Sequence, residues 1–325
     1  AILVLRQYGA EQLLQKIGAD ATGLPFNSIF AILLENDHPS TPLVNAGAIV
    51  ADSMVKPLGD SDGKWKAIVD NITDLCGSAP HLIDELYKSE SDTNFNNRSI
   101  AWLLKNYNRI YDDPTMSLDL YTRQCSLGIT AAQLSICAAT IASNGVNPVT
   151  KKQVFDAKLA PNIVSLIATV GFYEHTGDWL YTSGIPAKTG VGGGVMGVLP
   201  GLFGIAAFAP PIDDAGNSVK AQLAIKYIMN KLELNVFRSE PYFIEITVKG
   251  VDKAESIARL LEHIGMKREQ CICCGDGFND KTMVEYAGVG VAMGNAQQVV
   301  KDVADYVTAS CDEDGLVEVI KKFVL

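Results

Sequence analysis

The amino-acid sequence predicts an α/β fold in two parts: a helix-rich part with a sheet near its end, and a shorter part with a parallel sheet. The chain has 325 residues, more than the roughly 100–200 usual for one domain. Apolar residues recur at helical spacing along most of the first part, and glycine-punctuated apolar runs begin after Thr182. Beyond Phe237, strand-like and helix-like segments alternate, as in parallel sheets with right-handed crossovers. We therefore expect one domain over 1–237 and a second segment over 238–325.

Composition and charge narrow the classes of partner. Apolar residues make up 48% of the chain and charged residues 20%, which is ordinary for a globular protein. The net charge of −10 disfavours nucleic acids and anionic membranes, because both attract clustered Lys and Arg. No apolar run approaches the roughly 18 residues needed to cross a membrane. A small-molecule substrate is expected, without nucleic acid or membrane.

The seven cysteines are an odd number scattered through apolar context. We expect free thiols in a reducing cytoplasm. Cys271, Cys273 and Cys274 lie close together but lack further ligands at zinc-like spacing. This pattern favours a buried strand over a metal site.

The first part begins with a helix over 1–18 that is broken near Gly9. This helix is already under way at Ala1, so we expect further residues upstream. Residues 25–36 are predicted to be extended, and residues 38–55 to run from a loop into a helix of small residues. A further helix is predicted over 66–76.

A polar loop is predicted over 89–97, followed by an amphipathic helix. Thr130 is the expected N-cap of a later helix that Asn144 and Gly145 close. After Thr182, two apolar runs with tight turns predict adjacent strands, and a helix over about 216–232 ends the part. In the second part, strands and helices are predicted alternately over 243–248, 252–265, 269–277, 279–288, 289–294, 304–309 and 316–325.

The triplet Lys188-Thr189-Gly190, followed by glycines at 192–194, gives the first chemical signal. Lys-Thr-Gly is one of the signatures of penicillin-recognising serine enzymes. Together with further motifs in order, it makes residues 1 to about 237 resemble the serine-dependent glutaminases, relatives of the β-lactamase and transpeptidase fold. The motifs are PFNSI (25–29), NAGAI (45–49), SE with FNN (89–90 and 95–97), YTRQCS (121–126), GIPAKTGVGGG (184–194) and PPIDDAGNSVKA (210–221).

The resemblance implies hydrolysis of L-glutamine to L-glutamate and ammonia through an acyl-serine, without a cofactor. It assigns Glu90 to the substrate ammonium, and Asn45 and Asn97 to the amino-acid end. Residue by residue, each has a plainer interpretation. Glu90 alone is more often a solvated carboxylate, and Asn45 before a helix is more often an N-cap.

The resemblance also assigns roles at the reacting end of the substrate. Tyr121 and Tyr173 would serve as proton relay and positioning hydroxyl. The backbone N–H of Val191 would serve the oxyanion hole. The plainer interpretations are core rings with wet hydroxyls for the tyrosines, and an ordinary turn for the glycines.

The family's nucleophile lies in a Ser-x-x-Lys element upstream of NAGAI. Two segments match these letters, Ser53 to Lys56 and Ser61 to Lys64, but both follow Asn45. We therefore expect neither serine to be the nucleophile, and expect the nucleophile segment to be missing. A serine also needs an adjacent base to attack an amide, so we expect little turnover of glutamine by the chain as it stands.

Residues from about 238 to 325 resemble the C-terminal part of Cof-type haloacid dehalogenase-like phosphatases, a partial Rossmann-like segment. The motifs are KGVDKA (249–254), GDGFNDKTM (275–283), GVAMGNA (290–296) and ADYVT (304–308). The resemblance implies that Asp276 and Asp280 bind Mg²⁺, that Lys253 holds the phosphoryl group and that Asn279 helps to position it. The plainer interpretation is a strand-to-helix turn with an Asp cap.

This second family begins with an Asp-x-Asp strand. Asp60 to Asp62 and Asp312 to Asp314 match its letters in unsuitable surroundings, so we expect neither to be that element. Two enzyme fragments therefore meet near 234–241, and we expect an incomplete or composite chain. The leading prediction is a glutaminase, and a homo-oligomer is expected. The alternatives are a Mg²⁺-dependent phosphomonoesterase and a non-catalytic glutamine-binding chain whose tail mediates assembly.

Overall fold

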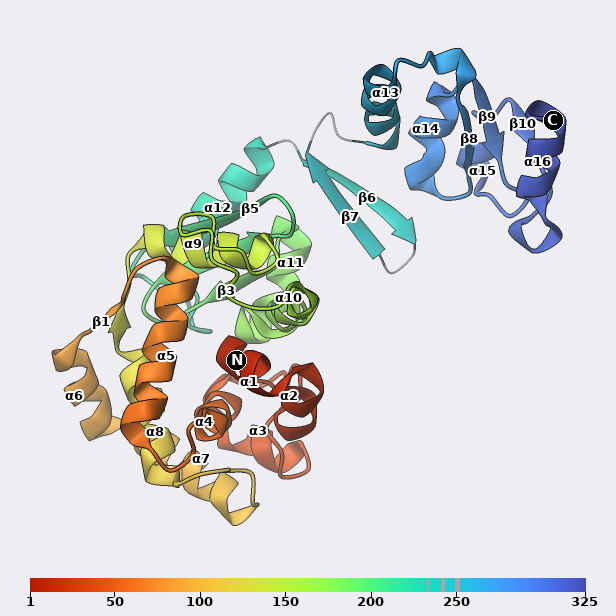
Figure 1. Ribbon diagram of the computed structural model, residues 1–325. Coiled ribbons are helices and arrows are strands. Elements are labelled where there is room, and N and C mark those ends of the chain that lie inside the picture. The colour runs from red at the N-terminus through yellow and green to blue at the C-terminus, as the bar shows by residue number, and fades with distance from the viewer. Residues whose placement is uncertain (233, 241–242, 249–251) are drawn as a thin grey trace. The chain divides into compact units, whose positions relative to one another are not determined.

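The computed structural model describes residues 1–232, 234–240, 243–248 and 252–325. Of residues 234–240 and 243–248 it describes the backbone alone. The chain divides into two compact units, Ala1–Tyr227 and Ile228–Leu325 (Figure 1). Pro241, in the predicted join, and the first three residues of the motif at 249–254 lie outside the described residues.

The first unit opens with helices α1 (Ile2–Tyr8) and α2 (Ala10–Lys16), which meet at Gly9. Gly9 has a φ of +84°, a backbone conformation that glycine adopts at no steric cost. The predicted break is thus confirmed. The extended segment predicted over 25–36 is wrong, because α3 (Ile29–Leu34) forms there and Ser28 caps it by accepting from the Ala31 N–H at 3.4 Å.

Helix α4 (Asn45–Met54) confirms the predicted helix of small residues. Helix α5 (Ser61–Cys76) begins earlier than predicted, because the Asp60 carboxylate accepts from the Gly63 N–H at 3.0 Å and caps it. Helix α8 (Pro114–Cys125) begins in the same way, at the capping residue Asp113.

The polar loop predicted over 89–97 is wrong. Helices α6 (Asp84–Thr93) and α7 (Phe95–Asn106) meet there at Asn94. Helix α6 has no buried residue, so its polar composition marks a solvated helix. The Arg98 guanidinium joins the two helices by donating to Asn94 Oδ1 at 2.8 Å and to the Ser91 carbonyl at 2.5 Å.

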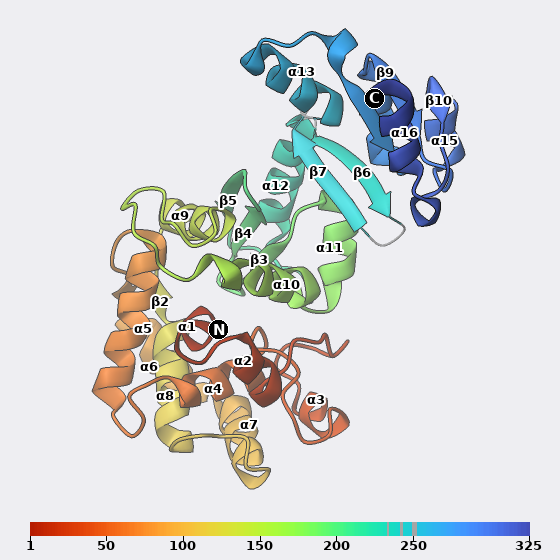
Figure 2. The same ribbon diagram turned by 45° about the vertical axis from the view of Figure 1, so that its right-hand side comes forward.

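The predicted strands after Thr182 are confirmed as an antiparallel sheet in the order β3-β4-β5. Helix α9 (Ala131–Ala142), with the predicted capping box at Thr130, packs against β5 (Figure 2). A Cβ added at Gly204 would lie 2.1 Å from the Ala139 nitrogen, so only glycine allows this approach. The other elements of this unit are β1 (His81–Leu82), β2 (Leu127–Gly128), α10 (Ala160–Val170), α11 (Thr176–Ser183), β3 (Ala187–Thr189), β4 (Gly194–Leu199), β5 (Phe203–Phe208) and α12 (Val219–Lys231), which continues into the second unit.

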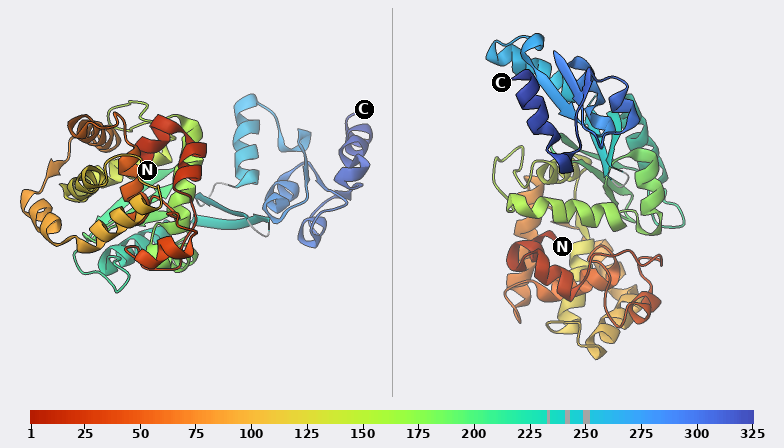
Figure 3. Two further views of the ribbon diagram at one scale, coloured as in Figure 1. Left: turned by 90° about the horizontal axis from the view of Figure 1, so that it is seen from below. Right: turned by 90° about the vertical axis from the view of Figure 1, so that its right-hand side faces the viewer.

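One continuous hydrophobic core holds the first unit together. Its buried side chains include Leu5 of α1, Ile49 of α4, Leu104 of α7 and Leu120 of α8, together with Ile167 of α10. The N-terminal helices lie beside α10 in both views of Figure 3. This core fixes α4 against α8, the two helices that carry much of the candidate site.

The second unit confirms a parallel sheet for its later strands, in the order β10-β9-β8. The strand predicted over 243–248 is wrong as a member of this sheet, because it pairs antiparallel with a preceding strand that was not predicted. Two earlier strands, β6 and β7, pair antiparallel by themselves. On the right of Figure 3, α16 lies beside the parallel strands, where the Phe323 and Tyr306 rings are 5.6 Å apart. The elements are β6 (Leu234–Glu240), β7 (Phe243–Val248), α13 (Lys253–Ile264), β8 (Ile272–Gly275), α14 (Lys281–Tyr286), β9 (Val289–Ala292), α15 (Gln298–Lys301), β10 (Tyr306–Val307) and α16 (Gly315–Phe323).

All seven cysteines are free thiols, as predicted. Cys273 and Cys274 lie on strand β8, with Cys273 buried, and Cys271 immediately precedes it. Among the described residues, no helix combines the length and the apolar character that crossing a membrane requires.

Candidate functional site

Two asparagines that the sequence singles out meet in the structure. Asn45 is the first residue of α4, and its Nδ2 donates to Oδ1 of Asn97 on α7 at 2.8 Å. The N-cap of α4 is Val44, so the plainer interpretation of Asn45 as a cap does not hold. The backbone N–H of Asn45 donates to the Phe26 carbonyl at 3.0 Å, which anchors the start of the helix.

Tyr121 and Cys125 lie one turn apart on α8, and each side chain affects the pKa of the other. Burial, followed by the negative charges of Asp52 and Glu90, raises the pKa of the Cys125 thiol, and Lys188 acts in the opposite direction. The charges of Glu90 and Lys188 thus act on a group at the end of α8. Sequence reasoning missed Cys125, although it is part of the motif at 121–126.

Tyr173 lies in the short segment between α10 and α11, far from Tyr121 and Cys125 in the sequence. Its φ of +54° is uncommon for a residue with a side chain. Its ring lies 4.6 Å from the Phe26 ring, and the Lys188 ammonium lies 4.3 Å from its centroid. The Thr189 N–H donates to the Gly171 carbonyl at 3.0 Å, so strand β3 is tied to the segment that carries Tyr173.

The ionisable groups of the cluster are shifted by burial. Burial raises the pKa of Tyr173 to about 12 and that of Tyr121 well above its ordinary value, with Cys125 adding to both shifts. Both hydroxyls therefore keep their protons at neutral pH and can donate hydrogen bonds. Burial lowers the pKa of Lys188 to about 7, so this amine can gain or lose a proton near neutral pH. Sequence reasoning had used Lys188 only as part of the triplet.

Val191 lies in the turn between β3 and β4 and is 51% exposed. The turn is closed by the Gly193 N–H, which donates to the Gly190 carbonyl at 2.9 Å. Within the described part of the chain, the Val191 N–H donates to no protein oxygen. A Cβ added at Gly216 would lie 3.0 Å from Val191 Cγ1 and 3.8 Å from Tyr173 Cε2, so these two residues flank the same glycine.

Asp52 on α4 is a buried carboxylate that sequence reasoning also missed. It is 4% exposed, and its Oδ2 has no hydrogen-bond partner within the described structure. Burial raises its pKa to about 7, against the positive charges of the Ala1 amine and Lys64. Its charge in turn raises the pKa of both Tyr121 and Cys125.

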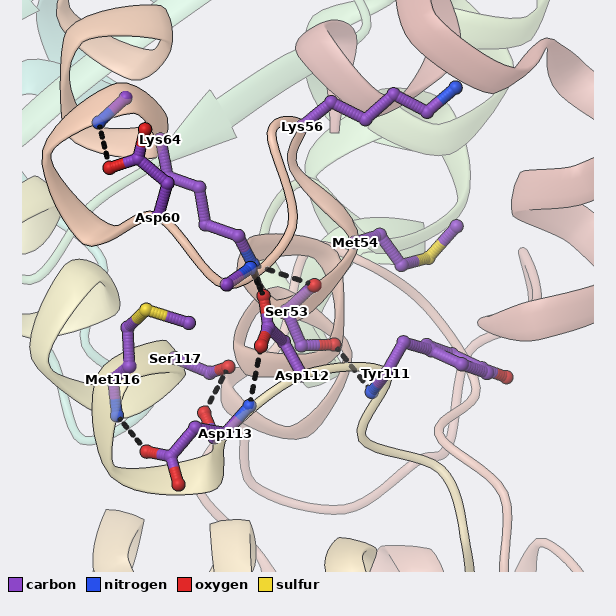
Figure 4. Close-up of polar contacts among 12 residues, drawn as sticks. Ser53, Met54, Lys56, Asp60, Lys64, Tyr111, Asp112, Asp113, Met116 and Ser117 are labelled. Carbon is purple, nitrogen blue, oxygen red and sulfur yellow. Dashed lines mark hydrogen bonds and ion pairs between the residues drawn. The ribbon is translucent and has the colours of Figure 1, made fainter.

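Ser53 and Lys64, one residue from each Ser-x-x-Lys match, lie in one cluster of polar contacts (Figure 4). Ser53 is fully buried, donates to the Val50 carbonyl at 2.6 Å and accepts from the Tyr111 N–H at 3.1 Å. Lys64 is fully buried in an ion pair of 2.5 Å with Asp112. Lys56 lies over the Tyr8 ring. Ser53 and Lys64 are therefore held by buried structural contacts.

The Asp-x-Asp matches are also structural. Asp60 is the cap of α5, with its side chain on the Gly63 N–H. Asp314, at a φ of +58°, lies in the turn that precedes α16.

In the second unit, Asp280 is held by three donors. Its Oδ1 accepts from Lys253 Nζ at 2.5 Å, and its Oδ2 accepts from the N–H groups of Asp276 and Gly277 at 3.0 and 3.1 Å. Burial acts to raise the pKa of Asp280, but these donors outweigh it and lower the pKa. Asn279 lies beside Asp280 in the same short turn and is half-buried.

These residues supply a limited set of oxygens for Mg²⁺. Among the described residues, no group of three acidic, His or Cys side chains is placed to hold a metal ion. Asp280 is committed to Lys253, whereas Asp276 is exposed and shares only its Oδ2, with Asn295 Nδ2 at 2.9 Å. Of the two carboxylates, only Asp276 keeps an oxygen that no protein donor contacts within the described residues.

Two family models match the chain. One, described as glutaminase, matches residues 1–237, and another, described as haloacid dehalogenase-like hydrolase, matches residues 212–320. The chain is 86% identical over 237 residues to the "Glutaminase" of Parabacteroides distasonis, which covers 73% of this chain and 74% of that protein.

Solved structures agree with this likeness. The structure of "Probable glutaminase ybaS" is similar with a TM-score of 0.69 and 43% identity, over 71% of this chain and 74% of that chain. The covalent complex of the Bacillus subtilis glutaminase YbgJ with 5-oxo-L-norleucine is similar with a TM-score of 0.65 and 26% identity, over 73% of this chain and 78% of that chain.

Proposed function

Because the chain belongs to the glutaminase family over residues 1–237, we propose that its first unit binds L-glutamine at the cluster of Asn45, Asn97, Glu90, Tyr121 and Tyr173. The observation that carries this proposal is contact between motif residues far apart in sequence, since Asn45 donates to Asn97 at 2.8 Å. In addition, Tyr173 raises the pKa of Tyr121, and the charge of Glu90 raises the pKa of Cys125 one turn along α8. The activity is hydrolysis of the side-chain amide of glutamine to glutamate and ammonia.

The residues have distinct parts in this proposal. The Glu90 carboxylate binds the substrate ammonium, and the amides of Asn45 and Asn97 bind the amino-acid end. The Tyr121 and Tyr173 hydroxyls, protonated at neutral pH, donate to the reacting end. The free N–H of Val191 binds the developing oxyanion, for which one donor is worth about 3–4 kcal/mol. Lys188, with a pKa of about 7, exchanges a proton near neutral pH.

Substitution of Glu90 tests the proposal. Calorimetry should detect L-glutamine binding to the full chain, and Glu90→Gln should weaken it roughly 10- to 100-fold, since a hydrogen bond to a charged group is worth about 1.5–3 kcal/mol. The matched control is Glu85→Gln, an exposed glutamate on the same helix α6, which should leave affinity unchanged. Ammonia release should follow the same pattern. Strong release that Glu90→Gln does not alter would show the assignment to be wrong.

We propose as a second candidate that the C-terminal segment is the partial Rossmann-like end of a Mg²⁺-dependent phosphomonoesterase. The match to haloacid dehalogenase-like hydrolases and the Lys253–Asp280 ion pair support it. Asp276 and Asp280 would bind the ion, Lys253 the phosphoryl group and Asn279 would position it. Phosphate release that requires Mg²⁺ and disappears in Asp276→Asn would support this activity. Release that continues in that variant would argue against it.

We also propose a cytoplasmic homo-oligomer. The free thiols are consistent with a reducing compartment. Large apolar side chains on α3 and α7, including Phe30 (70% exposed) and Trp102 (59% exposed), offer a surface for a second copy. Sedimentation of the full chain and of Phe30→Ser tests this, because a monomer in both cases would contradict it.

A further inference from the structure

The loop over residues 209–218, which connects β5 to α12, contacts the turn that carries Val191. At the start of this loop, the Ala209 N–H donates to the Gly193 carbonyl at 3.0 Å. Near its end, a Cβ added at Gly216 would lie 3.0 Å from Val191 Cγ1. The 209–218 loop therefore supports the turn at both Val191 and Gly193.

Gly216 is the point at which three distant segments of the chain meet. It is buried and has a φ of +89°. Besides its contact with Val191, an added Cβ would lie 3.5 Å from Phe26 Cε1 and 3.8 Å from Tyr173 Cε2. A residue with a side chain would be strained at this φ and would press on Val191. The loop thus lies against the residues that we assign to the reacting end of glutamine.

Asp213 holds the loop in this shape. Its Oδ1 accepts from the N–H groups of Ala215 and Asn217 at 3.1 and 2.9 Å, which is the way aspartate commonly orders a turn. The Gly216 N–H donates to the Asp213 carbonyl at 2.9 Å. The second carboxylate oxygen, Oδ2, accepts from Gln222 Nε2 of α12 at 3.1 Å. One side chain therefore fixes the residues on both sides of Gly216 and ties them to a helix.

The position of this loop matters because a hydrogen bond depends steeply on distance and angle. The Val191 N–H can serve a substrate oxygen only if it points at the place that the oxygen occupies. Val191 is 51% exposed, so its contact with Gly216 limits the turn on the side away from solvent. A shift of Gly216 would move the donor.

We propose that Asp213 is a positioning residue for the Val191 N–H, acting through Gly216, so that the 209–218 loop sets the strength of the hydrogen bond to the side-chain carbonyl of glutamine. This inference rests on the proposed glutamine site. In this role Asp213 makes no contact with the substrate. The loop matters for a ligand with that carbonyl and not for L-norvaline, which has a methyl group in place of the carboxamide.

The first experiment is titration calorimetry of the full chain with L-glutamine, and with L-norvaline in competition against it. Gly216→Ala should weaken glutamine binding roughly 2- to 10-fold, the range for one neutral hydrogen bond, and leave norvaline binding unchanged. The matched control is Gly201→Ala. Gly201 has a similar φ of +75°, but within the described structure no atom lies within 4 Å of an added Cβ. This variant should bind both ligands as the wild type does.

Substitution of Asp213 tests the same role without adding a clash. Asp213→Ala should cause the same selective loss, whereas Asp213→Asn keeps an Oδ1 acceptor and should restore most of the affinity. Asp214→Ala, at the exposed next residue of the loop, should change neither affinity. A measurement without ligand is hydrogen exchange of the peptide over 187–199, which should be faster in Asp213→Ala than in Asp214→Ala.

The outcomes separate this inference from the proposed function. If glutamine binds the wild type and binds Gly216→Ala and Asp213→Ala equally well, the inference is wrong and the glutamine site stands. Equal losses for glutamine and norvaline, or equal exchange in Asp213→Ala and Asp214→Ala, would also overturn it. Absence of glutamine binding to the wild type would overturn the proposed function and, with it, the role of Val191.

Discussion

Lys64 and Lys188 are held in different ways. Lys64 is fully buried, pairs with the Asp112 carboxylate at 2.5 Å and donates to the Ser53 carbonyl at 2.9 Å. Lys188 is only half-buried, contacts the Tyr173 ring and donates to the Thr189 carbonyl, with no carboxylate at ion-pair distance among the described residues. The first arrangement stabilises a fold, whereas the second leaves an amine with a variable charge.

Lys64→Met should be strongly destabilising. Removal of one member of a buried ion pair costs about 3–5 kcal/mol, because the other charge is left uncompensated. Urea denaturation of the full chain measures the loss. The double variant Lys64→Met/Asp112→Asn should recover part of it, and a Lys64→Met chain as stable as the wild type would contradict the ion pair's role.

Lys188→Met should stabilise the first unit by about 0.5–2 kcal/mol at neutral pH, the usual range for a stabilising substitution, because burial lowers the pKa of this amine. The folded pKa of about 7 lies below the ordinary 10.5, so the unfolded chain binds the proton more tightly. Lys188 therefore disfavours folding most at pH below 7, and its contribution improves as pH rises toward 10.5.

Denaturation midpoints at a series of pH values check this. The advantage of Lys188→Met over the wild type should shrink from pH 7 toward pH 10.5. An advantage that grows over this range would contradict the assigned shift. Glutamine binding should weaken in the same variant, whereas an exposed lysine of α7, in Lys105→Met, should alter neither property.

At the scale of single residues, the sequence predicted site residues that belong to family motifs, but not the residues that lie beside them in space. Asn45 and Asn97 could be named because the motif letters carry them, and the structure brings them into contact. Asp52 could not, since it lies outside the motifs and an aspartate in a helix of small residues is ordinary in sequence. Cys125 stands in a motif, but a cysteine at a helix end gives no chemical signal by itself. Their importance depends on the packing of α4 against α8, which no local pattern specifies.

At the scale of elements, Thr130→Ala should destabilise the first unit by about 1 kcal/mol. The Thr130 hydroxyl accepts from the Gln133 N–H at 3.1 Å and the Gln133 side chain accepts from the Thr130 N–H at 2.8 Å, and loss of such a cap costs about 0.5–2 kcal/mol. Urea denaturation measures it. Ser135→Ala on the same helix should change stability by less than about 0.5 kcal/mol, and equal losses in both variants would show that the cap is not the cause.

The elements that sequence predicted well have strong local signals. Helix α9 has its capping box, and β4 and β5 are apolar runs bounded by glycines. The predictions at α3 and α6 were wrong because the residues of these two helices do not have the composition of a typical helix. Helix α6 has no buried residue, although its Tyr87 hydroxyl donates to Asp119 of α8, and α3 exposes apolar side chains such as Leu34, at 73%. Neither shows the amphipathic period on which a helix prediction depends.

For the whole molecule, two compact units predict two unfolding transitions. Each unit has its own hydrophobic cluster, so heating should melt them separately in calorimetry. L-glutamine at about 100 times its dissociation constant should stabilise the first unit alone by about 2.7 kcal/mol. A single transition, or an equal shift of both transitions, would contradict independent units.

The hydrogen bond between Asn45 and Asn97 sets a limit on the heat of glutamine binding. The free site already satisfies these two amides with each other at 2.8 Å, so a substrate that takes one of them replaces a bond. The measured enthalpy should therefore be smaller than a count of the new contacts suggests, while the side chains lose little freedom because they are already ordered. The site would then favour a ligand that replaces this hydrogen bond at both amides. A ligand that leaves one of the two amides unpaired would bind less tightly.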